Sequence, residues 1–217
     1  MKFIGIVGSI SKESYNKKLM DYTKFIFNDL VDIDIVDLKG IPIFNEDIAD
    51  VNHPLVAEIS KKIDNSDGVI IATPEINYSM PPILKNLIEW LSFNLHPFRQ
   101  KPVMIIGASY NNQGTARAQM HLKQVLNAKG VDAFVIPGHE FLLTNAKDKF
   151  DEDGMIIDEE TNDYLEHNLM RFMEYAKLIN SLDLDNINSR LNLTLKAGGY
   201  VNIDDPDADG TAGASEY

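Results

Sequence analysis

The chain has 217 residues, of which 44% are hydrophobic, and a formal net charge of −13. This length suits one sizeable globular domain, and the negative charge argues against partners such as nucleic acid or an anionic membrane. Because the sequence has no cysteine, disulfides, thiolate metal sites and cysteine nucleophiles are excluded. It shows neither a signal peptide nor an apolar run of roughly 20 residues that would span a bilayer, so we expect a cytoplasmic protein.

The first half of the chain alternates short apolar runs with longer amphipathic segments. Residues 2–8 form a continuous apolar run, as in a strand buried on both faces, and 31–38 alternates with period two, as in a strand nearer a sheet edge. Between them, 14–29 has apolar residues at helical spacing, and a helix at 53–64 and a strand at 68–74 follow. The core face of the first helix is predicted to carry Leu19, Tyr22, Phe25 and Ile26.

The second half of the chain continues this alternation. A helix at 81–93 has two prolines in its first turn, where the missing N–H costs little. A strand at 102–109 precedes a helix at 115–130 that a glycine closes. A fifth strand is predicted at 131–137, and a long amphipathic helix at 162–182 completes the set.

Five strands separated by helical crossovers predict an α/β fold, namely a flavodoxin-like, doubly wound, five-stranded parallel sheet of order 2-1-3-4-5 with helices on both faces. We assign residues 1–182 to this domain. Residues 183–217 are polar, rich in Asn, Asp and Gly, and lack a sustained period, which predicts an extended C-terminal tail.

Ligands of such sheets bind beyond the carboxyl ends of the strands, where three loops of this sequence carry polar side chains. The loop after the first strand combines hydroxyls, an amide and a lysine at a helix start: Ser9, Ser11, Lys12, Ser14 and Asn16. This set predicts a phosphate cradle, although Ser and Asn also serve as ordinary helix caps. The loop has no G-x-G-x-x-G or Walker lysine motif, so the phosphate of another cofactor fits better.

The other two loops offer groups for a planar ring. The loop after the third strand has two stiffening prolines and three polar residues: Pro74, Pro81, Asn77, Tyr78 and Ser79. A plain proline-rich turn is its competing interpretation. The loop after the fourth strand has two glycines for close approach and three residues that could cover a ring: Gly107, Gly114, Ser109, Tyr110 and Asn111.

Short motifs are spread along residues 2–180. They are G-S-x-x-x-x-S-x-N at 8–16, IPIFNED at 41–47, P-E-x-N-x-S-x-P at 74–81, L-K-N-x-I-E-W at 84–90, G-A-S at 107–109, A-R-A-Q at 116–119 and K-F-D-E-D-G at 149–154. Together they resemble the NAD(P)H-dependent FMN reductase family, which includes azo, quinone and chromate reductases. The resemblance implies a homodimeric oxidoreductase with noncovalent FMN that receives hydride at flavin N5 from NADH or NADPH, with no catalytic side chain.

The same resemblance implies the cofactor-binding residues. The first loop would bind the FMN phosphate, with Ser11 where the family usually has Arg, so that either Lys12 supplies the charge or the affinity for the phosphate is lower. The second and third loops would contact the isoalloxazine ring, with Ile76 where the family usually has Tyr. The expected set is Ser9, Ser11, Lys12, Ser14, Asn16, Pro74, Glu75, Ile76, Asn77, Tyr78, Ser109, Tyr110 and Gly114.

No metal site is expected in the sequence. Residues 149–160 have acidic residues at several positions of a calcium loop, but Lys149 occupies the first position, where a carboxylate is needed. A solvated acidic loop is therefore the better interpretation of this segment.

The tail ends in D-G-T-A-G-A-S at 209–215, which resembles the acceptor motif D-x-x-S/T-G-A-T/S of flavin transferases, with Ala212 where Ser or Thr is usual. This resemblance implies a second FMN linked through its phosphate to Ser215. Its recognition residues would be Asp209, Gly213 and Ala214. Electrons would then pass from the noncovalent FMN to the tail-linked FMN and on to a partner reductase subunit. The alternatives are a free-standing quinone, azo or FMN reductase with an inert tail, and a flavodoxin-type electron carrier that is not an enzyme.

Overall fold

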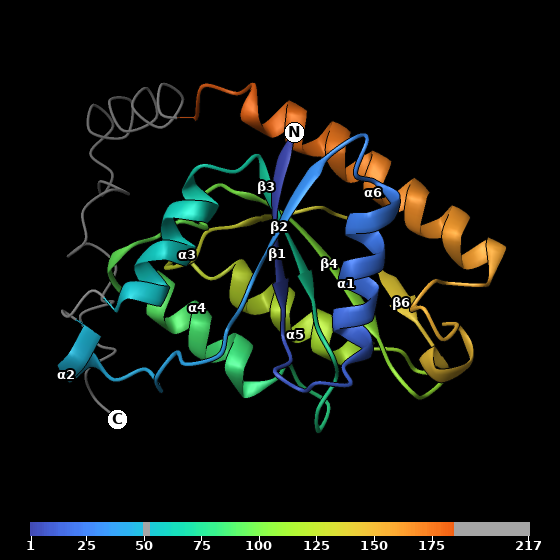
Figure 1. Ribbon diagram of the computed structural model, residues 1–217. Helices are drawn as coiled ribbons and strands as arrows, with labels where there is room; N and C mark the ends of the chain where they lie inside the picture. The colour runs from blue at the N-terminus through green and yellow to red at the C-terminus, as the bar shows by residue number, and fades with distance from the viewer. Residues whose placement is uncertain (50–52, 185–217) are drawn as a thin grey trace. The chain divides into compact units, whose positions relative to one another are not determined.

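One parallel β-sheet organises the chain in a computed structural model that describes residues 1–49 and 53–184 (Figure 1). Its strands are β1 (Lys2–Val7), β2 (Asp32–Val36), β3 (Gly68–Ala72), β4 (Pro102–Ala108), β5 (Phe134–Val135) and β6 (Phe141–Leu143). Their order is β2-β1-β3-β4-β5, with β6 also paired to β4, and every pairing is parallel. The predicted flavodoxin-like order is confirmed, with β2 at an edge of the sheet.

Helices cover both faces of this sheet (Figure 1). They are α1 (Tyr15–Ile26), α2 (Glu46–Ala49), α3 (Pro54–Asp64), α4 (Pro82–Asn94), α5 (Ala116–Leu126), α6 (Glu159–Asn180) and the 3₁₀ helix η1 (Ala146–Asp148). Successive side chains of a strand alternate between the two faces. Phe3 and Ile70 therefore pack with α1 and α6, while Ile4 and Ile71 pack with α3, α4 and α5. Both faces of the central strands are buried, as their continuous apolar runs predicted.

The fifth strand position differs from the prediction of one strand at 131–137. Only Phe134–Val135 pairs with the start of β4, and β6 then pairs with the end of β4. Between the two segments, Pro137 has no N–H to donate and Gly138 has a φ of 69°, so the strand cannot continue there. Two short strands replace the single predicted one, and the sheet has six strands instead of five.

Three helix boundaries differ from the prediction by three residues or more. The helix predicted at 14–29 ends at Ile26. The helix predicted at 115–130 ends at Leu126, where Asn127 serves as a right-handed C-cap, and Gly130 lies beyond it. The helix predicted to begin at 162 begins at Glu159. None of the helices within 1–49 and 53–184 is long and apolar enough to cross a bilayer.

The core face of α1 is narrower than the sequence predicts. Leu19 and Tyr22 are buried as expected, but Phe25 is 60% exposed. At 100° per residue, Phe25 lies about a third of a turn away from the line that joins Leu19 and Ile26. Its large apolar ring is therefore on the solvent side of the helix.

The acidic segment at 149–160 uses its carboxylates within the protein. The side chain of Asp151 accepts hydrogen bonds from the backbone N–H of Asp153 (3.0 Å) and of Met155 (2.8 Å). Asp158 accepts from the backbone N–H of Thr161 (3.0 Å) and pairs with Lys149 (2.9 Å). In the part of the chain that the structure describes, no group of three or more His, Cys, Asp or Glu residues could hold a metal ion.

Asp158 caps α6, and its charge contributes to stability. The Thr161 hydroxyl and the Lys149 ammonium lower the pKa of Asp158 to about 2. A carboxyl whose pKa is lowered on folding stabilises the protein above about pH 4, its unfolded pKa, and loses this effect as the pH falls towards 2. We expect Asp158→Ala to lower the melting temperature at pH 7 and the deficit to shrink between pH 4 and 2, as calorimetry would measure.

The matched control is Glu160→Ala in the same first turn of α6. A deficit for Asp158→Ala that stays constant from pH 7 to 2, or one that Glu160→Ala reproduces, would show that the Asp158 charge does not carry the effect.

Candidate functional site

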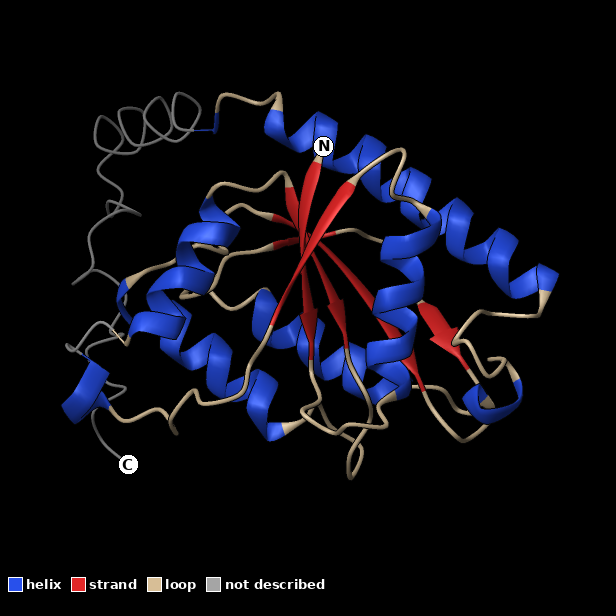
Figure 2. Ribbon diagram, in the orientation of Figure 1, coloured by secondary structure: helices blue, strands red, loops and turns tan. Residues whose placement is uncertain are grey.

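The loops that follow β1, β3 and β4 gather at the carboxyl ends of the parallel strands (Figure 2). At Gly107, β4 lies in close contact with the loop after β3 and with the start of α5. A Cβ atom on Gly107 would lie 1.9 Å from the Thr115 Oγ1 and 2.7 Å from the Thr73 carbonyl oxygen. Only glycine fits such a contact without displacing the backbone. The end of β4 therefore touches both the loop after β3 and the start of α5.

The loop after β1 presents hydroxyls at the N-terminus of α1. Ser14 is the N-cap, and its Oγ accepts the backbone N–H of Lys17 at 3.3 Å. The Oγ of Ser9 accepts the backbone N–H of Ser11 at 3.3 Å, while Ser11 and Lys12 are exposed. The hydroxyls of Ser9 and Ser14 each accept one hydrogen bond inside the loop, and each keeps its O–H for a ligand. Capping and anion binding are thus compatible in this loop.

Asn16 has a different environment from the other predicted residues of this loop. It is 2% exposed, and its side-chain amide makes two bonds to the same residue of β4. The Asn16 Nδ2 donates to the Ala108 carbonyl at 2.9 Å, and the Ala108 N–H donates to the Asn16 Oδ1 at 2.9 Å. Asn16 therefore fixes the start of α1 to the end of β4 and places the first loop beside the third.

The loop after β3 contains a tight two-residue turn. Ile76 and Ser79 exchange two backbone hydrogen bonds of 3.0 Å, and the residues between them, Asn77 and Tyr78, have φ values of 50° and 65°. Two successive left-handed residues define a type I′ turn, in which a tyrosine costs roughly 1–2 kcal/mol. Tyr78 is 71% exposed and Ile76 is 48% exposed. The turn presents its backbone and two side chains to solvent.

Glu75 fastens this loop to α5. Its carboxylate accepts the backbone N–H groups of Arg117 (2.9 Å) and Ala118 (3.2 Å), and it lies 3.4 Å from the Arg117 guanidinium. Thr115, at the N-cap position of α5, makes no capping hydrogen bond with its side chain. The helix thus takes its cap from another loop, where the negative charge also interacts favourably with the helix dipole.

Two further contacts hold the turn itself. The Arg117 guanidinium lies over the Tyr78 ring at 4.5 Å, a cation–π contact. The Ser79 hydroxyl bonds to the His121 ring nitrogen at 2.7 Å. Arg117 and His121 are four residues apart on one face of α5, and together they support the strained turn. Sequence analysis did not select Arg117 and His121 as site residues. Their spacing of four places both on one face of the helix after β4, and this spacing could have indicated that they face a common neighbour.

The loop after β4 lies close to the first loop. Tyr110 is 65% exposed and packs edge-on against Tyr15 at the start of α1, with ring centroids 5.0 Å apart. The Ser109 Oγ accepts the backbone N–H of Asn111 at 3.1 Å. Gly114 has a φ of 61°, and a Cβ there would lie 2.9 Å from the Leu142 Cβ in β6. The loop is therefore packed between α1 and β6.

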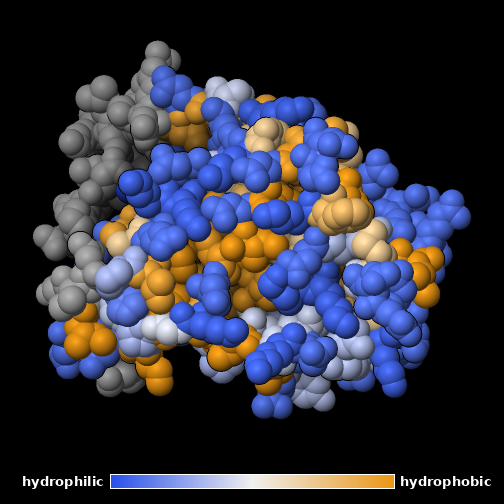
Figure 3. All heavy atoms as spheres, viewed as in Figure 1, coloured by the Kyte–Doolittle hydropathy of each residue, from blue (hydrophilic) through white to orange (hydrophobic). Residues whose placement is uncertain are grey.

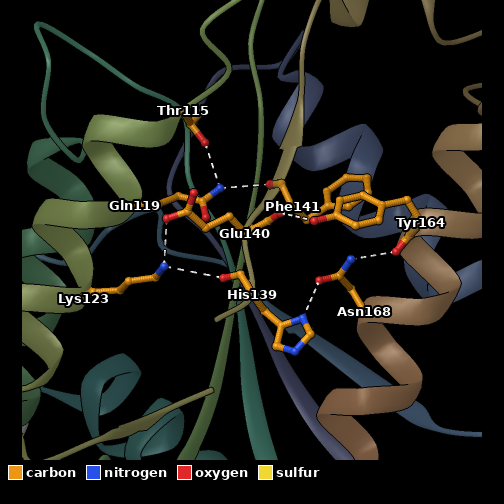
Figure 4. Close-up of polar contacts among 8 residues, drawn as sticks. All are labelled: Thr115, Gln119, Lys123, His139, Glu140, Phe141, Tyr164 and Asn168. Carbon is orange, nitrogen blue, oxygen red and sulfur yellow. Dashed lines mark hydrogen bonds and ion pairs between the residues drawn. The ribbon is translucent and has the colours of Figure 1, made fainter. Parts of the chain in front are cut away.

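A polar network behind this loop holds β6 between α5 and α6 (Figure 4). The buried Gln119 donates from its Nε2 to the Thr115 hydroxyl (3.0 Å) and to the Phe141 carbonyl (2.9 Å). The Tyr164 hydroxyl donates to the Glu140 carbonyl at 2.9 Å. Sequence analysis missed these contacts because it did not predict β6, although it noted Gln119 in the motif A-R-A-Q.

The structure brings the predicted cofactor residues to the carboxyl ends of the parallel strands. All thirteen belong to the three loops, to the strand ends or to the first turn of α1. Two concavities adjoin them, one of about 300 Å³ between the first loop and the end of β2, and one of about 410 Å³ lined by Tyr110–Gln113 and Asn145. The predicted flavinylation residues Asp209, Gly213, Ala214 and Ser215 lie outside the described residues.

A doubly wound parallel sheet of strand order 2-1-3-4-5, with helices on both faces, defines the flavodoxin-like class of proteins. Residues 1–148 match the family described as NADPH-dependent FMN reductase. A solved structure of similar fold is the flavoenzyme NAD(P)H:(acceptor) oxidoreductase FerB of Paracoccus denitrificans, with a TM-score of 0.74 and 26% identity over 81% of this chain and 97% of that one. The chain belongs to the NADPH-dependent FMN reductase family, and it is an NAD(P)H-dependent oxidoreductase that uses FMN.

Two similar relatives are each named as a subunit of a reductase. The NADH:(hydroxy)cinnamate reductase subunit CrdA of Vibrio ruber is 34% identical over 84% of this chain and 90% of its own length. The NADH-dependent flavin reductase subunit 2 of Lactobacillus johnsonii is 34% identical over 82% of this chain and 100% of its own length.

The bonds between Asn16 and Ala108 predict a large stability effect. Asn16→Ala would leave the buried N–H and carbonyl of Ala108 without partners, at a cost of about 3 kcal/mol in the free energy of unfolding. Urea denaturation would measure this loss. Ser11→Ala in the same loop is the control, because Ser11 is exposed and should change stability by no more than about 0.5 kcal/mol. Equal stability of the two variants would contradict the anchoring of α1 by Asn16.

Proposed function

We propose that noncovalent FMN binds across the three loops at the carboxyl ends of β1, β3 and β4. The observation that carries this proposal is the strained turn at Ile76–Ser79, which Glu75 and Arg117 hold rigidly next to a serine-rich helix start. Strain that the surrounding contacts maintain is common at ligand sites. A rigid turn with exposed backbone groups would suit the polar edge of a flavin, and hydroxyls at a helix start would suit its phosphate.

The phosphate end would be held by the first loop. Ser9, Ser11 and Ser14 supply O–H donors, Lys12 supplies a positive charge, and the first-turn N–H groups of α1 add the helix dipole. Asn16 would act by placing this loop, because its side chain is bonded to Ala108. Lys12 replaces the charge that the usual Arg of the family would provide.

The ring end would be held by the second and third loops. The backbone of Pro74–Tyr78 would line the polar edge of the ring, with Glu75 acting through its cap on α5. The exposed side chains of Ile76 and Tyr110 would cover apolar parts of the ring, and Ser109 and Gly114 would allow the third loop to approach closely. The bound flavin supplies hydride acceptance at N5, so no side-chain acid or base is needed.

We further propose that the protein works as an electron-delivering subunit and forms a homodimer. Electrons would leave the noncovalent FMN for a second FMN, attached by a flavin transferase to Ser215, and then reach a partner reductase. Two similar relatives carry the word subunit in their names, which supports a partner. The competing proposal is a free-standing quinone, azo or FMN reductase with an inert tail. A non-enzymatic flavodoxin-type carrier does not agree with membership of a reductase family.

The phosphate site predicts a charge effect on flavin affinity. Lys12→Ala should weaken FMN binding about tenfold, because a charge-assisted hydrogen bond to phosphate contributes roughly 1.5 kcal/mol. Fluorescence titration of the apoprotein with FMN would measure the dissociation constant. Lys24→Ala, in the last turn of the same helix, is the control. Unchanged affinity in Lys12→Ala, with NADH or NADPH still oxidised, would place the phosphate elsewhere.

The tail proposal predicts a covalent mass change. Protein co-expressed with a flavin transferase and denatured in acid should gain the mass of one FMN minus one water, and Ser215→Ala should lose this gain. Intact-mass spectrometry distinguishes the two. If the mass is unmodified while the transferase modifies a control substrate, the tail is not an acceptor and the free-standing reductase is the better proposal.

A further inference from the structure

An apolar hollow on one face of the protein is a pocket at the carboxyl end of the edge strand β2. Figure 3 shows it as an apolar depression surrounded by hydrophilic residues, on the face where β2 lies in front in Figure 1. The pocket has a volume of about 300 Å³. Its apolar lining comes from the ends of two adjacent strands and the residues after them: Val7, Ile35, Val36 and Leu38. Such a lining would suit a flat, largely apolar ring.

Positive charge also borders this pocket, in a chain with a net charge of −13. Lys12, Lys17 and Lys39 all line it. Lys17 pairs with Asp21 on α1. Neither Lys12 nor Lys39 has an ion-pair partner among residues 1–49 and 53–184. Lys12 lies on the side of the first loop, where it serves the proposed flavin phosphate, and Lys39 lies on the side of β2. The uncompensated ammonium group of Lys39 beside an apolar lining indicates a further ligand that combines a ring with an anionic group.

One carboxylate lies in the same wall. The Asp37 Oδ1 accepts the backbone N–H of Lys39 at 2.9 Å, which shapes the turn after β2. Asp37 makes no other bond within the described residues, so its second oxygen is open to the pocket's ligand. In doubly wound folds with a G-x-G-x-x-G loop, an acidic residue about 20 residues further on binds ribose hydroxyls. This chain lacks that loop motif, but a carboxylate at this place would accept from ribose hydroxyls in the same way and would repel a phosphate at the 2′ position.

The second concavity does not offer an alternative for an anion. It is lined by Tyr110–Gln113 and Asn145, which are all neutral. Of these two concavities, the one at the end of β2 has lysines in its lining and the other has none. The end of β2 is two strand spacings from β3, about 10 Å, which is within the span of an extended dinucleotide.

We propose that the pocket at the end of β2 binds the adenosine diphosphate end of the electron donor, and that it favours NADH over NADPH. Lys39 would contact the diphosphate, Asp37 would accept from the ribose hydroxyls, and the apolar lining would take the adenine. Lys12 stays with the flavin phosphate. This inference rests on the proposed function, because it assumes that a nicotinamide donor meets a flavin above β3 and β4.

Steady-state kinetics on the FMN-loaded protein tests the diphosphate contact. Lys39→Glu should raise the KM for NADH at least tenfold, because it removes a charge-assisted hydrogen bond to phosphate and adds repulsion, and should leave kcat and FMN affinity unchanged. ADP should inhibit wild type in competition with NADH and inhibit Lys39→Glu at least tenfold more weakly. Lys24→Glu makes the same charge change in the last turn of α1, outside the lining of this pocket, and controls for net charge.

Asp37→Asn tests the selectivity separately. Asn keeps an oxygen that can accept the Lys39 N–H, so the turn should persist while the charge is lost. We expect the ratio of kcat/KM for NADH to that for NADPH to fall about tenfold.

The inference is overturned if Lys39→Glu keeps the wild-type KM and ADP inhibition, or if Asp37→Asn keeps the wild-type ratio. ADP binding by calorimetry does not depend on turnover. It therefore separates failure of this pocket from failure of the proposed reductase function, which would appear as wild-type protein that binds FMN but oxidises neither donor.

Discussion

The pair of hydrogen bonds between Asn16 and Ala108 is the constraint on which the rest of the site depends. It joins the start of the first helix to the end of the fourth strand, across the carboxyl edge of the sheet. It holds the loop after β1 beside the loop after β4, and the contact between the Tyr15 and Tyr110 rings joins the same two regions. Gly107 permits a second junction, between β4, the loop after β3 and the start of α5, because a side chain there would displace both Thr73 and Thr115. The site is therefore assembled by contacts between strand ends and not by any single loop.

Rigidity at this edge comes from strain that neighbouring elements offset. The turn at Ile76–Ser79 places Tyr78 in a backbone conformation that costs free energy. The cap that Glu75 provides for α5 stabilises the folded protein and offsets part of this cost. The carboxylate, the guanidinium of Arg117 and the ring of Tyr78 form one continuous contact. Loop and helix thus stabilise each other, and a ligand would meet a turn that is already in place, which lowers the entropic cost of binding.

Charge is distributed so that the acidic protein keeps local positive groups near the strand ends. Lys12 lies in the first loop and Lys39 lies in the turn after β2, and neither has an ion-pair partner among the described residues. In the proposals above, one lysine serves the flavin phosphate and the other serves the donor diphosphate. Both partners of the hydride transfer would then be held by their anionic ends, and their rings would meet above the central strands. The negative charge elsewhere would discourage other polyanions.

The sequence by itself determined the strands β1 to β4, the five longer helices and their order, and it placed polar loops after β1, β3 and β4. Buried parallel strands need apolar residues on both faces, and helices need a 3.6-residue period, so the order of the elements and the loops at the strand ends followed from local pattern. Only the tertiary structure decided how the fifth strand position is divided at Pro137, that Asn16 bonds to Ala108, and that Glu75 caps a helix more than forty residues away. These are contacts between segments distant in the chain, and local periodicity carries no information about them.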